Sequence, residues 1–262
     1  MINKTLGIIG GTGWLGGAIA RAVLAKGLVP AANLIISNRS GNHPLAEQGA
    51  RLVTDNQALV DRSDVVIIAV RPEHFASLNI NATGKTVISL MAGISAQTIV
   101  AQISASAVVR AMPNAAVEIG QSFTPWYCFA EVAATTKRFV QSVFECVGTA
   151  AEVQQEDCID YLSALSGTGP AFPALLMTAL ANQAMAAGIP ADIAQRAAKS
   201  VVVNSSQLLA SQDAQQMIDA LVAYRGVTAA ALKVMIHGQF EEQIGEALRE
   251  GAAVARRGLQ AG

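Results

Sequence analysis

Residues 6–17 read LGIIGGTGWLGG, an apolar run that breaks into closely spaced glycines. The spacing Gly11-x-Gly13-x-x-Gly16 is the fingerprint of a dinucleotide-binding turn between a strand and a helix. We expect Gly11 to allow the turn, Gly13 to let the backbone approach a pyrophosphate, and Gly16 with Gly17 to let the helix pack closely on the strand. The amides at the start of that helix would hold the phosphates. The spacing alone leaves open an ordinary glycine-rich turn of an α/β protein.

A second apolar run, NLIISNRS at residues 33–40, follows a helical segment at 18–26 whose next residue, Gly27, suits a helix C-cap. The order of elements predicts a βαβ unit. An acid at the end of the second strand holds the ribose of NAD, whereas residues 37–40 carry no carboxylate and include Arg39. We therefore expect NADPH as the cofactor, with NADH possible. A solvated arginine at a strand end is the alternative.

The composition indicates a folded protein that binds small molecules. Of 262 residues, 52% are hydrophobic and 14% charged, which suits a chain that buries much of its surface in one large domain or two of ordinary size. The net charge of -1 and the pI near 6.3 provide no basic surface for a polyanion. We expect no nucleic-acid partner.

The cysteines and the N-terminus favour a cytoplasmic location. Three cysteines without paired spacing predict reduced, buried thiols rather than disulfides. Met1 leads directly into the first strand, with no signal sequence, and no apolar run reaches the length of a membrane span without a polar interruption. The most apolar helix, expected at 171–187, contains a polar pair at 182–183 and is interpreted as a bundle or interface helix. The cysteines are Cys128, Cys146 and Cys158.

Three further β-branched runs predict parallel strands that are covered on both faces. Each run ends in a loop of small or polar residues. Because ligands of doubly wound sheets bind outside the carboxyl ends of the strands, we expect these loops to line one crevice. The strands are expected at residues 64–70, 86–90 and 107–110.

Beyond about residue 160 the sequence changes to long Ala-, Gln-, Met- and Leu-rich segments with helical spacing. We expect a nucleotide-binding domain at 1–158 and an all-helical domain at 159–262. Such apolar helices cannot all hide their faces within so small a domain. An interwoven homodimer or a higher homo-oligomer is therefore expected.

Four loops follow one another along the chain: Val70-Arg-Pro72, Met91-Ala-Gly93, Arg110-Ala-Met-Pro-Asn114 and Leu165-Ser-Gly-Thr-Gly-Pro-Ala-Phe172. Taken together, they resemble the successive signature loops of pyrroline-5-carboxylate reductases, which complete proline synthesis. The resemblance runs in order through nearly the whole chain. It implies a Rossmann-type doubly wound sheet followed by an all-helical C-terminal dimerisation domain, with dimers that often assemble into decamers. It also implies an NAD(P)H-dependent oxidoreductase acting on a C–N bond of a small cyclic imine carboxylate.

The resemblance also implies the cofactor contacts. Asn56 would hydrogen-bond the adenosine or its ribose, although an ordinary helix N-cap before Ala58 is an equal alternative. Arg71 would offer charge near a phosphate or ribose, and Pro72 would stiffen the loop beneath the nicotinamide half. The full set is Gly11, Thr12, Gly13, Trp14, Leu15, Gly16, Asn38, Arg39, Ser40, Asn56, Ala69, Val70, Arg71, Pro72 and Ala92.

The chain departs from the family pattern in two places. The glycine turn at 9–13 has one extra residue and resembles that of prephenate dehydrogenases and deazaflavin-dependent NADP reductases. More seriously, the family's Ser-Pro-Gly-Gly-Thr-Thr, which grips the substrate carboxylate, becomes AYRGVT at 223–228. Gly226 and Thr228 remain, and Thr228 could cap the helix or donate to an anion. Arg225 could contact the carboxylate, with a solvent-facing turn residue as the alternative.

The expected chemistry is hydride transfer from the nicotinamide to a cyclic imine. The reaction requires positioning more than a general acid, because a protonated imine already accepts hydride readily. No cluster has metal-ligand spacing, so we expect no metal site. The three histidines lie in turns or at helix ends and are interpreted as surface residues rather than catalysts: His43, His74 and His237.

Other functions stay open. A reductase of a different imine would use Arg225, Tyr224 and the pair 126–127 to reshape the pocket, although that Trp-Tyr pair is more often core packing. A non-catalytic NADP-binding paralogue would explain the altered segment at 223–228. A β-hydroxyacid-type dehydrogenase is disfavoured, because Pro173 stands where those enzymes carry a catalytic lysine.

Overall fold

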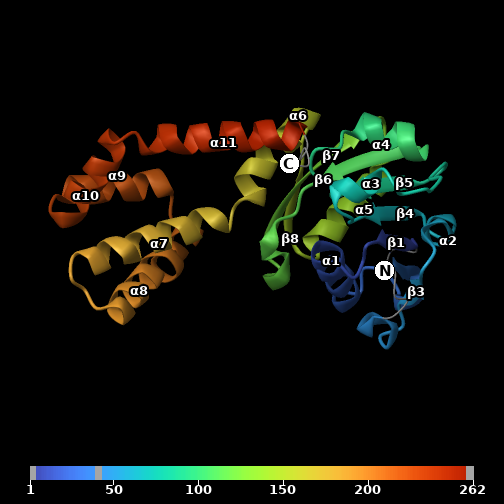
Figure 1. Ribbon diagram of the computed structural model, residues 1–262, viewed down its shortest axis with the longest axis horizontal. Coiled ribbons are helices and arrows are strands. Elements are labelled where there is room, and N and C mark those ends of the chain that lie inside the picture. The colour runs from blue at the N-terminus through green and yellow to red at the C-terminus, as the bar shows by residue number, and fades with distance from the viewer. Residues whose placement is uncertain (1–3, 39–42, 258–262) are drawn as a thin grey trace. The chain divides into compact units, whose positions relative to one another are not determined.

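An eight-stranded sheet forms the centre of the N-terminal part of the chain (Figure 1). The computed structural model describes residues 4–38 and 43–257. The strand order is β3-β2-β1-β4-β5-β6-β7-β8, and every neighbouring pair is parallel except β6 and β7. The strands are β1 Leu6–Ile9, β2 Leu34–Ser37, β3 Arg51–Val53, β4 Val65–Ile68, β5 Thr86–Ser89, β6 Ala107–Ala111, β7 Ser122–Phe129 and β8 Gly148–Glu152.

The sheet is covered on both faces, as the continuous apolar strands predict. All residues of β1, β2 and β4 are buried. One hydrophobic cluster joins the sheet to α1 (Trp14–Ala25) and α5 (Ala134–Glu145), and a second joins it to α2, α3 and α4. The Rossmann-type doubly wound sheet is thereby confirmed. The helices of the second cluster are α2 Asn56–Asp61, α3 Pro72–Phe75 and α4 Ala96–Ile103.

Three strands are absent from our expectation: β3 at one edge of the sheet, and β7 and β8 at the other. Strand β7 runs antiparallel to β6, with Ala111 paired to Trp126. It contains Pro125, and a proline within a run argues against a central strand. Strand β8, GTAAE, has a single β-branched residue, Thr149, and is otherwise glycine, alanine and glutamate, which strands disfavour.

The described chain divides into two compact units. Unit 1 comprises the residues up to 168 together with those from 250 onward, and unit 2 comprises residues 169–249. The division differs from the expected boundary at 158/159, because α6 (Glu156–Leu162) and the following π-helical turn, Ser163–Gly167, pack with the sheet unit. The assignment of separate functions to two domains stays a prediction.

Unit 2 is helical, as expected. Helix α7 packs with α8, and α9 packs with α10. The bounds are α7 Ala171–Ala186, α8 Ala191–Lys199, α9 Ala214–Tyr224 and α10 Val227–His237, and α11 Phe240–Arg257 leads out of the unit.

The stretch Glu156–Ala186, which comprises α6, the π-helical turn and α7, is long and apolar enough to cross a membrane by length and composition only. Its most apolar 18-residue window has a mean hydropathy of 1.3. Polar residues interrupt the stretch, so it does not contradict our expectation that no apolar run reaches the length of a span without such an interruption. Length and composition alone are weak evidence, because a core helix passes the same test. The polar pair at 182–183 lies inside this stretch.

Candidate cofactor site

The glycine turn begins one residue earlier than we expected. Gly10 follows β1 directly and has φ of +77°, whereas Gly11 does not have a positive φ. A Cβ atom on Gly10 would lie 2.8 Å from the Ala69 carbonyl oxygen, and the Gly13 amide donates to the Gly10 carbonyl at 2.9 Å. Gly10 therefore allows the turn. Gly11 serves packing instead, since its Cβ would lie 2.5 Å from Ile36 Cγ2.

The helix after the turn packs closely because of Gly16, as predicted. A Cβ atom there would lie 2.6 Å from the Gly10 carbonyl oxygen and 3.0 Å from Ala69 Cβ. The prediction was wrong for Gly17, where the nearest atom is the flexible tip of Arg21 at 3.3 Å. Gly13 begins the helix as its N-cap without a side-chain cap, so the first amides of α1 stay available to a ligand.

A cleft of about 480 Å³ opens at the carboxyl ends of β1, β2 and β4. The predicted cofactor residues that line it are Thr12, Gly13, Asn38, Asn56, Ala69, Val70 and Arg71. The remaining ones that the structure describes do not line it: Gly11, Trp14, Leu15, Gly16, Pro72 and Ala92. Arg39 and Ser40 lie outside the described residues. Lining residues that we did not predict include Thr54, His74, Ser77 and Leu78.

Asn56 is held by a buried hydroxyl group. Ser37 Oγ donates to Asn56 Oδ1 at 2.7 Å, and Ser37 is only 1% exposed. The alternative of Asn56 as a helix N-cap is wrong, because Asp55 is the N-cap of α2 and accepts from the Gln57 amide. Since its oxygen is engaged, the amide group of Asn56 is the donor left for a ligand.

The described lining of the cleft suits a polyanion. Arg71 and His74 are its basic residues, and no carboxylate is among the described residues that line it. Arg71 is exposed and approaches Glu73 at 3.7 Å, an exposed pair that contributes little. The glycine turn leaves room for a pyrophosphate, and the strand end lacks the acid that would repel a 2′-phosphate. The described residues therefore fit NADPH.

Two family models match the chain. One, described as NADP oxidoreductase coenzyme F420-dependent, matches residues 5–93. The other, described as pyrroline-5-carboxylate reductase dimerisation, matches residues 156–258. The first match agrees with the resemblance of the glycine turn to deazaflavin-dependent reductases.

A pyrroline-5-carboxylate reductase of Synechocystis sp. is 31% identical to the chain over 265 residues, covering 98% of each protein. The chain belongs to the pyrroline-5-carboxylate reductase family. Among solved structures of this family, the reductase of Coxiella burnetii has a TM-score of 0.84 and 26% identity, covering 97% of this chain and 98% of that one. The reductase of Plasmodium falciparum with NADP bound has a TM-score of 0.81 at 23% identity, covering 98% of each chain, a likeness of fold.

The segment that departs from the reductase pattern forms the turn between α9 and α10. Arg225 and Gly226 have φ of +64° and +101°. Gly226 is the N-cap of α10, without a side-chain cap, so Thr228 in the first turn does not cap the helix as we had considered. Arg225 and Thr228 are both exposed. Their roles toward the substrate of a reductase stay a prediction.

The remaining interpretations concern aromatic and histidine residues. Trp126 is 3% exposed and its indole donates to Gln141 at 2.8 Å, so this residue belongs to the core. His43 caps a short helical turn, and no metal-binding group is found among the described residues. His74 is exposed, as expected, but it lines the cofactor cleft.

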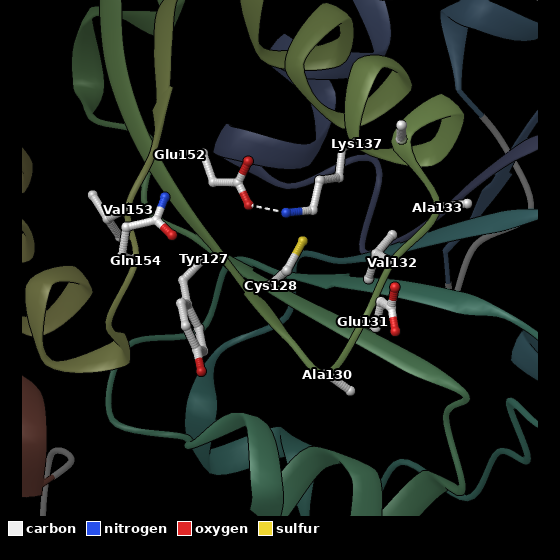
Figure 2. Close-up of a pocket in the computed structure, with 11 residues that line it drawn as sticks. Tyr127, Cys128, Ala130, Glu131, Val132, Ala133, Lys137, Glu152, Val153 and Gln154 are labelled. Carbon is white, nitrogen blue, oxygen red and sulfur yellow. Dashed lines mark hydrogen bonds and ion pairs between the residues drawn. The ribbon is translucent and has the colours of Figure 1, made fainter.

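A second cleft, also of about 480 Å³, lies beside the end of β7 (Figure 2). Cys128 and the Lys137–Glu152 ion pair line it. Burial raises the pKa of the Cys128 thiol to about 11, with Lys137 acting to lower it and Glu152 to raise it. The three cysteines are free, as predicted, although only Cys146 is fully buried.

Proposed function

We propose that this chain reduces 1-pyrroline-5-carboxylate to L-proline with NADPH. Family membership over 98% of the chain carries the proposal. The cleft at the glycine turn supports it, because its described lining fits a dinucleotide with a 2′-phosphate. NADPH, when bound, supplies the hydride that the imine carbon accepts.

The residues of the cleft would hold and orient the cofactor. The first amides of α1, beginning after Gly13, suit the pyrophosphate, because helix N-termini attract anions. Asn56, fixed by Ser37, offers an amide donor to the adenosine half. The loop of Ala92 follows β5, next to β4, and is assigned to the nicotinamide half by the family resemblance.

Arg225, Gly226 and Thr228 would bind the carboxylate of the substrate. An arginine can form a paired contact with a carboxylate, which hydroxyl groups supply in the family's usual segment. The exposed backbone amides at the start of α10 add donors at the same turn. The replaced residues favour a second candidate, a reductase of a different cyclic imine carboxylate.

The helices of unit 2 would assemble two copies into a dimer. Leu175, Val234 and Ile236 are 70%, 72% and 58% exposed, and apolar side chains at this density mark an association surface. The match to a dimerisation family model supports the same assignment. A decamer of such dimers and a cytoplasmic location complete the proposal.

Turnover assays with the purified protein test this function. We expect NADPH to be oxidised in the presence of pyrroline-5-carboxylate, followed by its absorbance, with one proline formed for each NADPH consumed. Turnover of piperideine carboxylates alone would replace this substrate with another cyclic imine. NADPH binding without turnover of any imine would contradict an enzymatic role and favour the non-catalytic paralogue.

A further inference from the structure

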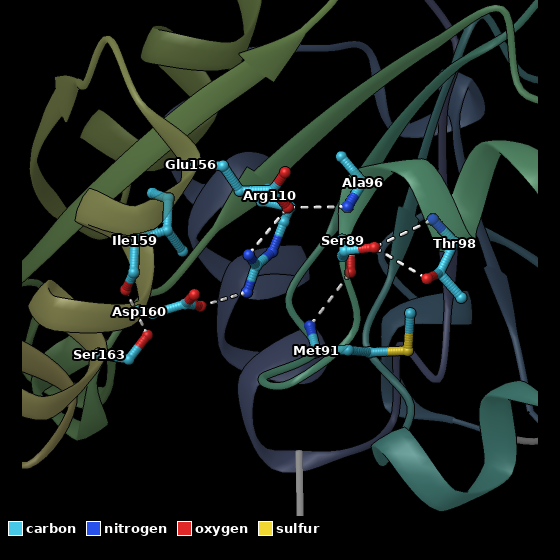
Figure 3. Close-up of polar contacts among 10 residues, drawn as sticks. Ser89, Met91, Ala96, Thr98, Arg110, Glu156, Ile159, Asp160 and Ser163 are labelled. Atoms are coloured by element: carbon cyan, nitrogen blue, oxygen red, sulfur yellow. Dashed lines mark hydrogen bonds and ion pairs between the residues drawn. The ribbon is translucent and has the colours of Figure 1, made fainter. Parts of the chain in front are cut away.

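A buried arginine joins the end of β6 to helix α6 (Figure 3). Arg110 is 3% exposed and donates through Nη1 to Glu156 and through Nη2 to Asp160, each at 2.9 Å. The two acids lie four residues apart, on one face of α6. One guanidinium therefore faces two carboxylates.

Glu156 makes a second contact that Asp160 does not make. Its Oε1 atom also accepts from the Ala96 amide at 2.8 Å. Ala96 is the first residue of α4, where backbone amides have no partner within the helix. A single carboxylate oxygen thus connects β6, α4 and α6.

The Ala96 contact holds one end of the loop that carries Ala92. The other end is held too, because the Met91 amide donates to Ser89 Oγ at 3.2 Å and the Leu90 amide donates to the Ile68 carbonyl at 3.1 Å. Strand β4, which ends at Ile68, leads directly into the cofactor cleft. The loop is therefore short and pinned at both ends.

We propose that Glu156 is a positioning residue that fixes the Ala92 loop for hydride transfer. The inference rests on the proposed function, which assigns this loop to the nicotinamide. Glu156 is not among the described residues that line the cleft, and it acts through its hydrogen bond to the backbone of Ala96.

The charges explain why the second acid is present. Asp160 is 7% exposed and alone neutralises Arg110, so Glu156 is surplus for that purpose. The amide end of α4, which carries a partial positive charge, favours the additional carboxylate, and Arg256 lines the same small cavity. Arg110 Nε is left without a partner, so among the described residues the cluster does not complete the hydrogen bonding of the arginine. The distinct contribution of Glu156 is the hydrogen bond that it accepts from the Ala96 amide.

Variants of Glu156 test the proposal, with Glu152 as a matched control. Glu152 forms an ion pair with Lys137 elsewhere in unit 1 and has no bond to the loop (Figure 2). We compare Glu156→Ala, Glu156→Gln and Glu152→Ala in the full chain. The thermal midpoint of each variant shows whether it folds, and the glutamine variant keeps an oxygen that can accept from Ala96 while it removes the charge.

Hydrogen exchange of the backbone measures the loop without any turnover. Glu156→Ala should accelerate exchange of the Ala96 amide about tenfold or more, since the amide loses its partner. Glu156→Gln should stay near wild type, and Glu152→Ala should not change this amide. Equal exchange in wild type and Glu156→Ala would overturn the proposal.

Kinetics measure the consequence for the reaction. Glu156→Ala should lower kcat by about ten- to a hundredfold with little change in KM, because misplacement of a reacting group costs rate more than affinity. The isotope effect with NADPH deuterated at the transferred position should rise, and Glu156→Gln should recover most of kcat. A loss of kcat no larger than that of Glu152→Ala would overturn the positioning role. A wild-type protein that reduces no imine would overturn the proposed function instead, while the exchange result would still decide whether Glu156 holds the loop.

Discussion

The two compact units differ in how far they bury their large apolar side chains. In unit 1, whole strands and the facing sides of α1, α4 and α5 are buried in two clusters. In unit 2, long apolar helices leave large side chains such as Leu175 and Val234 exposed. The described buried hydrophobic residues of unit 2 are mostly alanines: Ala181, Ala194, Ala198, Ala229 and Leu248.

The difference shows which parts of the fold a single chain can stabilise. Burial contributes about 25 cal/mol for each square ångström of apolar surface, so unit 1 obtains its stability from its own core. Unit 2 lacks such a core and requires a surface from another molecule. We infer that the stability of unit 2 depends on protein concentration, as in obligate dimers.

The largest effect is expected from Gly13→Asp, which should damage unit 1's cofactor site and leave unit 2's association unchanged. The carboxylate would stand at the start of α1, beside the cleft. Two like charges ~4 Å apart near a protein surface repel by about 4 kcal/mol, so the affinity for NADPH should fall roughly a thousandfold. Fluorescence titration measures the affinity, and light scattering measures the mass.

Gly17→Ala is the control for that variant. Its Cβ would lie 3.3 Å from the flexible tip of Arg21 and at an ordinary contact distance of 3.5 Å from the Gly11 carbonyl oxygen. NADPH affinity should therefore stay unchanged while helix α1 gains up to ~1 kcal/mol of stability. Equal NADPH affinity in wild type and Gly13→Asp would remove the glycine turn from the cofactor site.

A charge placed on the apolar face of unit 2 should have the next largest effect. Leu175→Glu puts a carboxylate where α7 exposes 70% of a leucine, and burying that charge at an interface without a partner is costly. We expect monomers at micromolar concentration by light scattering. Ile119→Glu, at a position in unit 1 that is 72% exposed, should leave the mass unchanged. If both variants became monomers, or neither did, the proposal that unit 2 and not unit 1 forms the association surface would be wrong.

A smaller effect is expected at the turn between α9 and α10. Arg225→Ala and Thr228→Ala should each raise KM for the imine about tenfold, because a hydrogen bond to a charged group contributes about 1.5–3 kcal/mol. NADPH affinity should stay constant, since the cleft that fits the cofactor lies in unit 1. Lys233→Ala, which removes a cation from α10, is the control. Unchanged KM in both test variants would place the substrate carboxylate elsewhere.

Much of unit 1 could be predicted from the sequence because its strands are continuous apolar runs. Strands β1, β2 and β4 are buried on both faces, and their almost entirely apolar sequences predict this burial. The choice of Gly10 as the turn residue could not be predicted, since the extra glycine allows two positions for the positive φ. Unit 2's helices follow from their spacing, but that spacing does not specify what covers their exposed apolar side chains.

The missed parts of the site depend on contacts between distant residues. His74, Ser77 and Leu78 line the cleft. Only His74 lies in the short helix that Pro72 starts, because α3 ends at Phe75, so helical spacing does not predict the positions of Ser77 and Leu78. The Arg110 cluster joins positions 46 and 50 residues apart. The spacing of the two acids on α6 predicts a shared face, whereas their partner follows only from the fold.

The smallest effect concerns the thiols, which report on unit 1 alone because no cysteine lies in residues 169–249. Alkylation requires the thiolate, so the rate at Cys128 should rise about tenfold per pH unit until the pH nears its pKa of about 11.

The raised pKa of Cys128 also determines in which direction the stability of the folded chain changes with pH. Because the folded pKa of Cys128 is raised from 9.0 to about 11, the unfolded chain releases this proton first, and the contribution of the thiol to stability is lost as the pH rises between these values. Lys137→Gln should slow alkylation a few-fold and Glu152→Gln should accelerate it, since the first residue lowers this pKa and the second raises it. Mass spectrometry of the Cys128 peptide measures each rate. In Leu175→Glu the rate should match wild type, because unit 1 keeps its core when the association of unit 2 is lost; a large acceleration there would show that unit 1 also depends on the second copy.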